Sequence, residues 1–307
     1  VGREIIDEYK KIIENFEDTS NKFTENYIKK ENFSQTLKIQ STYNPNILNS
    51  SQKINHYKKR IFTNLEPIYK NKGKSQIKLI KNKFQRYFEI RKREKFLNLN
   101  SIKNIEDNNF ILFPMQSMPE AKVLTISPFY SNQITLIENI AKSIPINTIL
   151  YVKEHPIQKT KLWRSVEFYK KIIAIPNVKL VHPSVDSQEL IANTKAVILI
   201  SGGTGFEAIF YKKPVILFSE EIYEELSTVT KVSKFDNLHK EISEAITNFK
   251  FNIKEINALM TVIENQSITI PYFTIIKEGV TLSAIQRNKK NPEVTLQYFK
   301  KFYEKYE

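Results

Sequence analysis

Three short stretches of this sequence carry the glycine and polar residues best suited to hold a negatively charged ligand. The first follows the apolar run AVILI and is Ser-Gly-Gly-Thr-Gly, with three of the chain's six glycines in four positions. Glycines permit a tight turn, and the amino terminus of a following helix carries about half a positive charge. The pattern predicts a phosphate site formed by Ser201, Gly202, Gly203, Thr204 and Gly205.

The same stretch has a second interpretation that needs no ligand. Thr204 and Glu207 fit a capping box, in which two side chains satisfy the amides at the start of a helix. The stretch matches neither the GxxxxGK[ST] nor the GxGxxG phosphate-binding loop. Capping and phosphate binding are compatible, so both interpretations stay open.

The second stretch is YVKEHP, in which Lys153 and His155 directly follow an apolar run. A lysine can hold a phosphate, and a histidine can hold it or donate a proton to it as it leaves. The third stretch is the loop FPMQSMPE, where Gln116 and Glu120 could face a sugar or an acceptor hydroxyl. A loop histidine satisfied by backbone groups and an ordinary solvated loop are the alternatives.

A parallel sheet would bring these stretches together. From Phe110 onward, short apolar runs alternate with helical patterns, the runs being FILFPM, TILYVK, VKLVH, AVILI and PVILF. Strands without polar alternation are buried on both faces, and helices between them indicate βαβ units. We therefore predict an α/β fold with a Rossmann-like, doubly wound parallel sheet, which binds ligands at the carboxyl ends of its strands.

The region before this sheet reads as basic helices. The net charge is +14, and residues 53–103 hold 16 Lys and Arg against three Asp and Glu. Such a patch attracts phosphate polymers, anionic glycans or an acidic membrane surface, or is simply a solvated helix face. We divide the chain into a helical basic region (1–108), a Rossmann-like domain (109–285) and a C-terminal helix (286–307). With no cysteine and four scattered histidines, no metal site is expected.

In this order, the three stretches resemble the capsule polysaccharide biosynthesis family, which includes bacterial Kdo transferases. The likeness rests on Gln116 to Glu120, on Lys153-Glu-His-Pro156 and on Gly203-Thr-Gly-Phe-Glu-Ala208, and covers about residues 110–220. It implies a GT-B glycosyltransferase whose C-terminal domain holds an activated sugar. By that analogy Lys153, His155 and Arg164 meet the donor phosphate, the backbone of 201–205 helps to bind it, and Glu207 approaches the ribose.

The resemblance also implies a reaction and its partners. Glu120 and His155 would be catalytic and Gln116 would face the acceptor or sugar, without a metal or other cofactor. The donor would be a nucleotide sugar, CMP-linked and Kdo-like, and the acceptor an anionic surface glycan. We expect a cytoplasmic protein that touches the inner face of the membrane through residues 53–103, and no nucleic-acid partner. A CDP-polyol phosphotransferase of the teichoic-acid type and a non-catalytic basic module that binds anionic polymers are the alternative functions.

Overall fold

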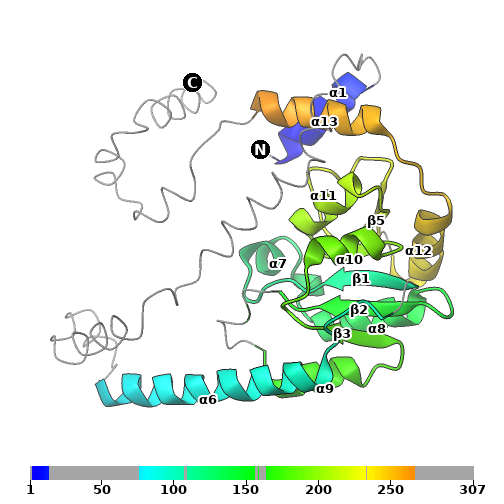
Figure 1. Cartoon of the computed structure of the whole chain (residues 1–307). Helices are drawn as coiled ribbons and strands as arrows, with labels where there is room; N and C mark the ends of the chain where they lie inside the picture. Colours follow the sequence, from blue (N-terminus) through cyan, green and yellow to red (C-terminus); the bar gives the residue numbers. More distant parts are fainter. Residues whose placement is uncertain are drawn as a thin grey trace, which may run out of the picture.

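A single six-stranded parallel sheet forms the centre of the protein, with strand order β3-β2-β1-β4-β5-β6 (Figure 1). The computed structural model describes residues 2–13, 76–106, 109–155, 158, 164–232 and 234–266. The strands are β1 (Phe110–Pro114), β2 (Ile149–Lys153), β3 (Val178–Val181), β4 (Val197–Leu199), β5 (Val215–Leu217) and β6 (Val229–Lys231). This strand order is that of a doubly wound Rossmann-type sheet.

Helices cover both faces of the sheet (Figure 1). On one face lie α8 (Gln133–Ser143), α9 (Val166–Ile173) and α12 (Leu238–Thr247). On the other lie α10 (Ser187–Asn193) and α11 (Gly203–Phe210), with α1 (Gly2–Ile13) and α13 (Ile253–Gln266) packed on each other outside them. Short helices α7 (Ala121–Thr125), η1 (Pro128–Tyr130) and η3 (Phe235–Asn237) sit in loops, and the long α6 (Gln76–Asn100) packs on α9.

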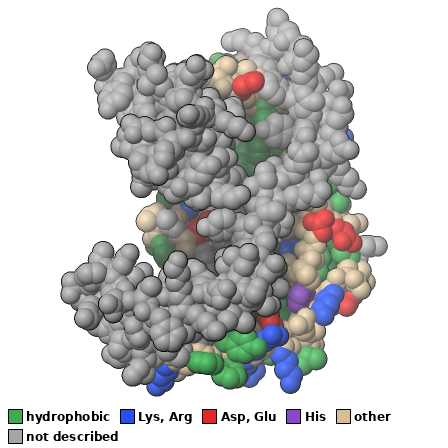
Figure 2. Space-filling view, turned by 60° about the vertical axis from the view of Figure 1, so that its left-hand side comes forward, with side chains coloured by type: hydrophobic (Ala, Val, Ile, Leu, Met, Phe, Trp, Pro, Cys, Tyr) green, Lys and Arg blue, Asp and Glu red, His purple; other side chains and the backbone are tan. Residues whose placement is uncertain are grey.

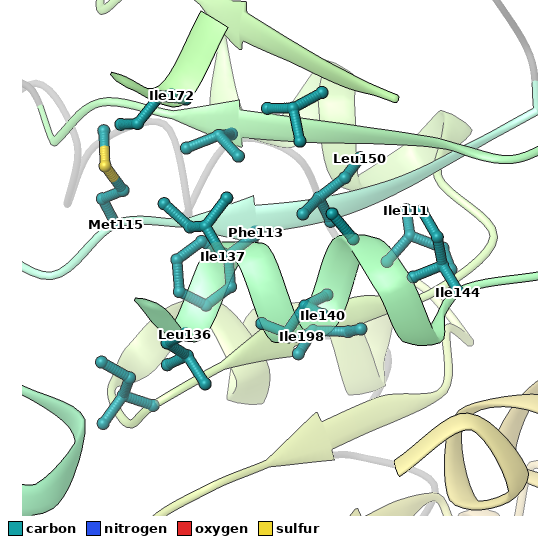
Figure 3. Close-up of a cluster of buried hydrophobic side chains, with 14 of the residues drawn as sticks. Ile111, Phe113, Met115, Leu136, Ile137, Ile140, Ile144, Leu150, Ile172 and Ile198 are labelled. Atoms are coloured by element: carbon teal, nitrogen blue, oxygen red, sulfur yellow. The ribbon is translucent and has the colours of Figure 1, made fainter. Parts of the chain in front are cut away.

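The apolar strands are buried because successive side chains point to opposite faces and each face is covered. Ile111 and Phe113 enter the cluster beneath α8 and α9, where Figure 3 shows Phe113 beside Ile137 and Ile111 beside Ile144. Phe110 and Leu112 enter the cluster under α10 and α11. The strands thus serve two cores, which is why their sequences lack polar alternation.

The predicted fold class is confirmed in the described residues: a Rossmann-like parallel sheet preceded by the helical segments α1 and α6. The five predicted strands form within two residues of their expected bounds, and β6 was not predicted. Residues 14–75 and the predicted helix 286–307 lie outside the described residues, and the boundary at 108/109 stays a prediction. Of the helices described, none has the length and apolar character needed to cross a bilayer.

Candidate functional site

Two of the predicted stretches meet at the carboxyl edge of the sheet, between β1 and β4. The chain leaves these neighbouring strands in opposite directions, from β1 toward β2 and β3 and from β4 toward β5 and β6. Open parallel sheets bind ligands at such a switch point. Here the side-chain amide of Gln116, after β1, donates a hydrogen bond to the carbonyl of Ser201, after β4.

The loops after β1 and β2 are joined by a buried set of polar side chains, which we call the strand-end network: Gln116, Gln133, Glu154, Arg164 and Tyr169. The Arg164 guanidinium donates to the Glu154 carboxylate and to the Gln116 carbonyl. Tyr169 donates to the other Glu154 oxygen at 2.5 Å, and the Gln133 side chain bonds both backbone groups of Gln116. These contacts hold the two loops in a fixed position relative to each other. Removing Arg164 or Glu154 would leave the other charge buried and uncompensated, which is strongly destabilising.

Two of the predicted ligand-binding residues, Arg164 and Gln116, belong to the strand-end network. Arg164 is buried, and its guanidinium is already bonded to three groups of the protein. Its contact with phosphate stays a prediction, and burial within the network argues against it. Gln116 is also buried, and its amide nitrogen bonds Ser201. Its contact with an acceptor or sugar is likewise a prediction, and the geometry favours a role in joining the two loops.

Lys153, the last residue of β2, carries a buried charge that the described residues do not pair. Its side chain is 3% exposed, and its ammonium has no hydrogen-bond partner among them. Burial lowers the pKa of Lys153 to about 8, against the opposing effect of the Asp186 and Glu154 carboxylates. The Ser201 hydroxyl is buried and unpartnered in the same way. Buried polar groups are nearly always satisfied, so both are candidates to receive a ligand.

Glu207 lies on α11, one turn beyond the glycine stretch. Burial, together with the nearby Asp186 carboxylate, raises the pKa of Glu207 to about 7. Asp186 is the N-cap residue of α10, and its carboxylate raises the pKa of both Lys153 and Glu207. A lysine and a glutamate whose pKa values move toward neutrality at one edge of a sheet are typical of a functional site.

The glycine turn (residues 201–205) is held by a loop that follows β5. Gly202 adopts φ 110°, a conformation that favours glycine. Its N–H donates to the Glu221 carboxylate at 2.6 Å, and its carbonyl accepts from the Tyr223 hydroxyl at 2.5 Å. At Gly205 a Cβ would lie 2.6 Å from that hydroxyl, whereas at Gly203 it would meet nothing within 4 Å. Gly202 and Gly205 are thus required by the turn itself.

The predicted capping box at Thr204 and Glu207 is wrong. The helix begins at Gly203 with Gly202 as its N-cap, so Thr204 lies inside the first turn, and no side chain caps the helix. The Gly202 amide is bonded to Glu221, which argues against its contact with a phosphate; that contact stays a prediction. The amides of Gly203, Thr204 and Gly205 belong to the first turn of α11 and stay the predicted phosphate contacts.

The two predicted catalytic residues lie in the loops after β2 and β1. His155 is exposed, and its backbone N–H donates to the Glu154 carboxylate at 2.6 Å. The strand-end network therefore fixes the backbone that carries the imidazole. Glu120 precedes α7 at its N-cap position without capping the helix. Both catalytic roles stay predictions.

Sequence reasoning missed Glu154, Gln133, Glu221 and Tyr223. Charged residues at the carboxyl end of an otherwise apolar strand were the one usable signal, and they mark Glu154 as well as Lys153. The other three act through contacts between residues 17 to 21 positions apart, which no local pattern reveals. Within the described residues, no group of His, Cys, Asp or Glu could hold a metal ion.

The sheet order, and a buried Lys153 ammonium without a hydrogen-bond partner among the described residues, define a Rossmann-type α/β protein with a site suited to an anionic ligand. The chain belongs to the family described as capsule polysaccharide biosynthesis protein, which matches residues 6–256. The resemblance drawn from the three motifs is thereby confirmed. No curated protein matches the sequence.

Solved structures with a similar fold include two parts of KpsC from Thermosulfurimonas dismutans. The beta Kdo 2,7 transferase is 16% identical with a TM-score of 0.34, covering 58% of this chain and 61% of its own. The beta Kdo 2,4 transferase is 14% identical with a TM-score of 0.35, and the match covers 57% of this chain and 63% of that chain. The UDP-GlcNAc 2-epimerase of Methanocaldococcus jannaschii is 18% identical with a TM-score of 0.38, covering 57% and 49%. This chain thus spans less than two thirds of each, and such TM-scores define neither activity nor substrate.

Proposed function

We propose that this protein is a glycosyltransferase that moves a sugar from a nucleotide donor to a bacterial surface or capsular polysaccharide. Family membership supports the reaction class. The observation that carries the proposal is the buried Lys153 ammonium, which has no hydrogen-bond partner among the described residues and lies at the carboxyl edge of the sheet. A buried ammonium is costly unless an anion pairs with it, and a donor phosphate is such an anion.

The proposed roles divide between donor and acceptor. Lys153, His155 and the amides at the start of α11 hold the donor phosphate, and Glu207 accepts hydrogen bonds from the ribose hydroxyls. The bond between the sugar and the phosphate oxygen breaks, and its electron pair stays on the nucleotide. Lys153 and the helix terminus stabilise that charge, so no metal is needed. The acceptor oxygen forms the new bond, and its proton passes to the Glu120 carboxylate.

We further propose a CMP-linked donor such as CMP-Kdo and an anionic glycan acceptor. This follows the family likeness and the basic character of residues 53–103. In the GT-B architecture that the likeness implies, a second domain would hold the acceptor. The described sheet would then be the donor half, and nucleotide binding is the property to test first.

The test is thermal unfolding of the 307-residue chain during titration with CMP, CDP and UDP. A ligand that binds only the folded state stabilises it by RT ln(1 + L/Kd), where L is the free ligand concentration, so the melting temperature rises with ligand concentration. We expect CMP to raise it and His155→Ala to remove most of the rise. His239→Ala is the matched control, because His239 lies on α12 and contacts the Ser143 carbonyl.

Three results would count against the proposal. The absence of a response to all three nucleotides would remove the donor site. A response that His155→Ala and His239→Ala leave equally intact would move the site elsewhere. A response to CDP-glycerol with none to CMP or a CMP-sugar would indicate a polyol phosphotransferase instead.

A further inference from the structure

Helix α6 is the most basic element of the described chain, and only part of it packs on the sheet domain. Its 25 residues include eight Lys and Arg against two Glu. Arg93 and Leu97 are buried, and Phe96 packs against the core beneath α8 and α9. Figure 1 shows the first half of the helix extending beyond α9. The packed portion therefore anchors a helix whose other residues need a separate explanation.

Three of the four aromatic residues of α6 lie on the face opposite the residues that pack on the protein. Phe84, Tyr87 and Phe88 are 63%, 53% and 65% exposed. Nine positions separate Phe84 from the buried Arg93, which is about two and a half turns and so the opposite side of the helix. These three rings therefore do not form the face of α6 that packs on the protein.

Basic residues share this outward face. Lys81, Arg91, Lys92 and Lys95 are exposed, and the Arg91 guanidinium lies 5.4 Å from the centre of the Tyr87 ring. Figure 2 shows hydrophobic and basic side chains next to each other along the lower edge of the molecule, where α6 lies. The face thus combines apolar rings with positive charge.

We propose that α6 lies on the surface of an anionic lipid bilayer. An interfacial helix buries apolar rings at the boundary between headgroups and acyl chains while its Lys and Arg side chains contact acidic headgroups. This surface accounts for both the rings and the charges. An acidic polymer would satisfy the charges alone and leave Phe84 and Phe88 in water, unless it offers bases on which they can stack.

The test is co-sedimentation of the 307-residue chain with phosphatidylcholine vesicles, with and without phosphatidylglycerol. We expect binding only to the anionic vesicles, weakened by salt. Phe84→Ser with Phe88→Ser should lower the affinity about tenfold or more, because two rings no longer leave water. Lys81→Gln with Lys92→Gln should lower it about fivefold for each charge removed. Circular dichroism checks that each variant is folded.

Matched controls carry the same changes elsewhere on the surface. Phe129→Ser removes a ring that is 76% exposed beside α7, and Lys250→Gln with Lys254→Gln removes two exposed charges near α13. Vesicle binding that the controls weaken as much as the α6 variants overturns the proposal. So does failure to bind anionic vesicles, or vesicle binding that survives loss of both α6 rings. Binding of single-stranded RNA in preference to the vesicles, lost with Phe84 and Phe88, assigns α6 to nucleic acid instead. Nucleotide binding is measured separately and does not affect these outcomes.

Discussion

At the scale of single residues, the protein keeps an ammonium group where burial disfavours it. The pKa of Lys153 falls from 10.5 to about 8, so at neutral pH the folded chain holds a charge that water would solvate better. Such a group lowers the stability of the free protein and is retained at sites that need it for binding. A single substitution of Lys153 should therefore raise stability and weaken ligand binding, so the two effects can be measured separately.

Lys153→Met keeps the length of the side chain and removes its charge. We expect the free energy of unfolding to rise by about 1–3 kcal/mol at neutral pH, while the response of the melting temperature to CMP is lost. Between pH 8 and 10.5 the unfolded chain holds a proton that folded Lys153 has released, so wild-type stability gains from this group as pH rises. The variant lacks that gain.

Lys195→Met is the control, because Lys195 is exposed and precedes β4 at the opposite edge of the sheet. Chemical denaturation across this pH range measures both effects. A Lys153→Met protein that is less stable than wild type, or that still responds fully to CMP, would contradict the assignment.

The pKa of Glu207 moves in the opposite direction and rises from 4.5 to about 7. The folded chain holds its proton more tightly, so this group's contribution to stability is complete below pH 4.5 and is lost as pH rises through 7. Glu207→Gln should flatten that part of the pH profile. Since a hydrogen bond to a charged group contributes about 1.5–3 kcal/mol, the variant should also lose a preference of about tenfold for CMP over 2′-deoxy-CMP.

The control for this change is Glu244→Gln, on the far helix α12, where the carboxylate pairs with exposed Lys240. Isothermal titration with the two nucleotides gives the preference directly. Equal preference for CMP in Glu207→Gln and wild type would show that Glu207 does not contact the ribose 2′-hydroxyl.

At the scale of elements, the glycine turn depends on the loop after β5 as well as on its own glycines. Tyr223→Phe removes only the hydroxyl that donates to the Gly202 carbonyl. We expect a loss of about 1–2 kcal/mol in stability from the unsatisfied carbonyl. Because the turn aims the first amides of α11, the affinity for CMP should fall more than the affinity for cytidine. Tyr211→Phe, at the other end of α11, is the control, and an equal loss for CMP and cytidine would argue against this role.

The difference between local features and contacts between distant residues also explains what could be predicted from the sequence. The five strands from β1 to β5 follow from apolar runs, whereas β6 is a three-residue edge strand, VTK, with partly exposed side chains and no apolar run. Lys153 and the glycine turn were found because strand ends are local features. Arg164 was expected at the phosphate from the family resemblance alone, and that contact stays a prediction; its pairing with Glu154 depends on folding of the loop between them, which no local pattern reveals. The capping box failed because Glu221 and Tyr223, from a distant loop, hold the turn that local capping would otherwise have to fix.

At the scale of the whole molecule, the first described helix belongs to the packed domain. Ile5 and Tyr9 of α1 are buried in the cluster that also contains α13 and the strand residues Phe110 and Leu112. This cluster joins residues 2–13 to residues 253–266 on one face of the sheet. The family match over residues 6–256 is consistent with one folding unit that includes α1.

If α1 and the sheet unfold together, a cavity in α1 must destabilise the whole unit. Ile5→Ala is expected to lower the free energy of unfolding by about 2–4 kcal/mol, the usual cost of truncating a buried isoleucine. The transition should stay single and cooperative when followed by circular dichroism and by hydrogen exchange of the β1 amides. Ile146→Ala, at a residue that is 90% exposed, should change stability little. If the β1 amides of Ile5→Ala keep the wild-type level of protection from hydrogen exchange, α1 instead unfolds separately from the sheet.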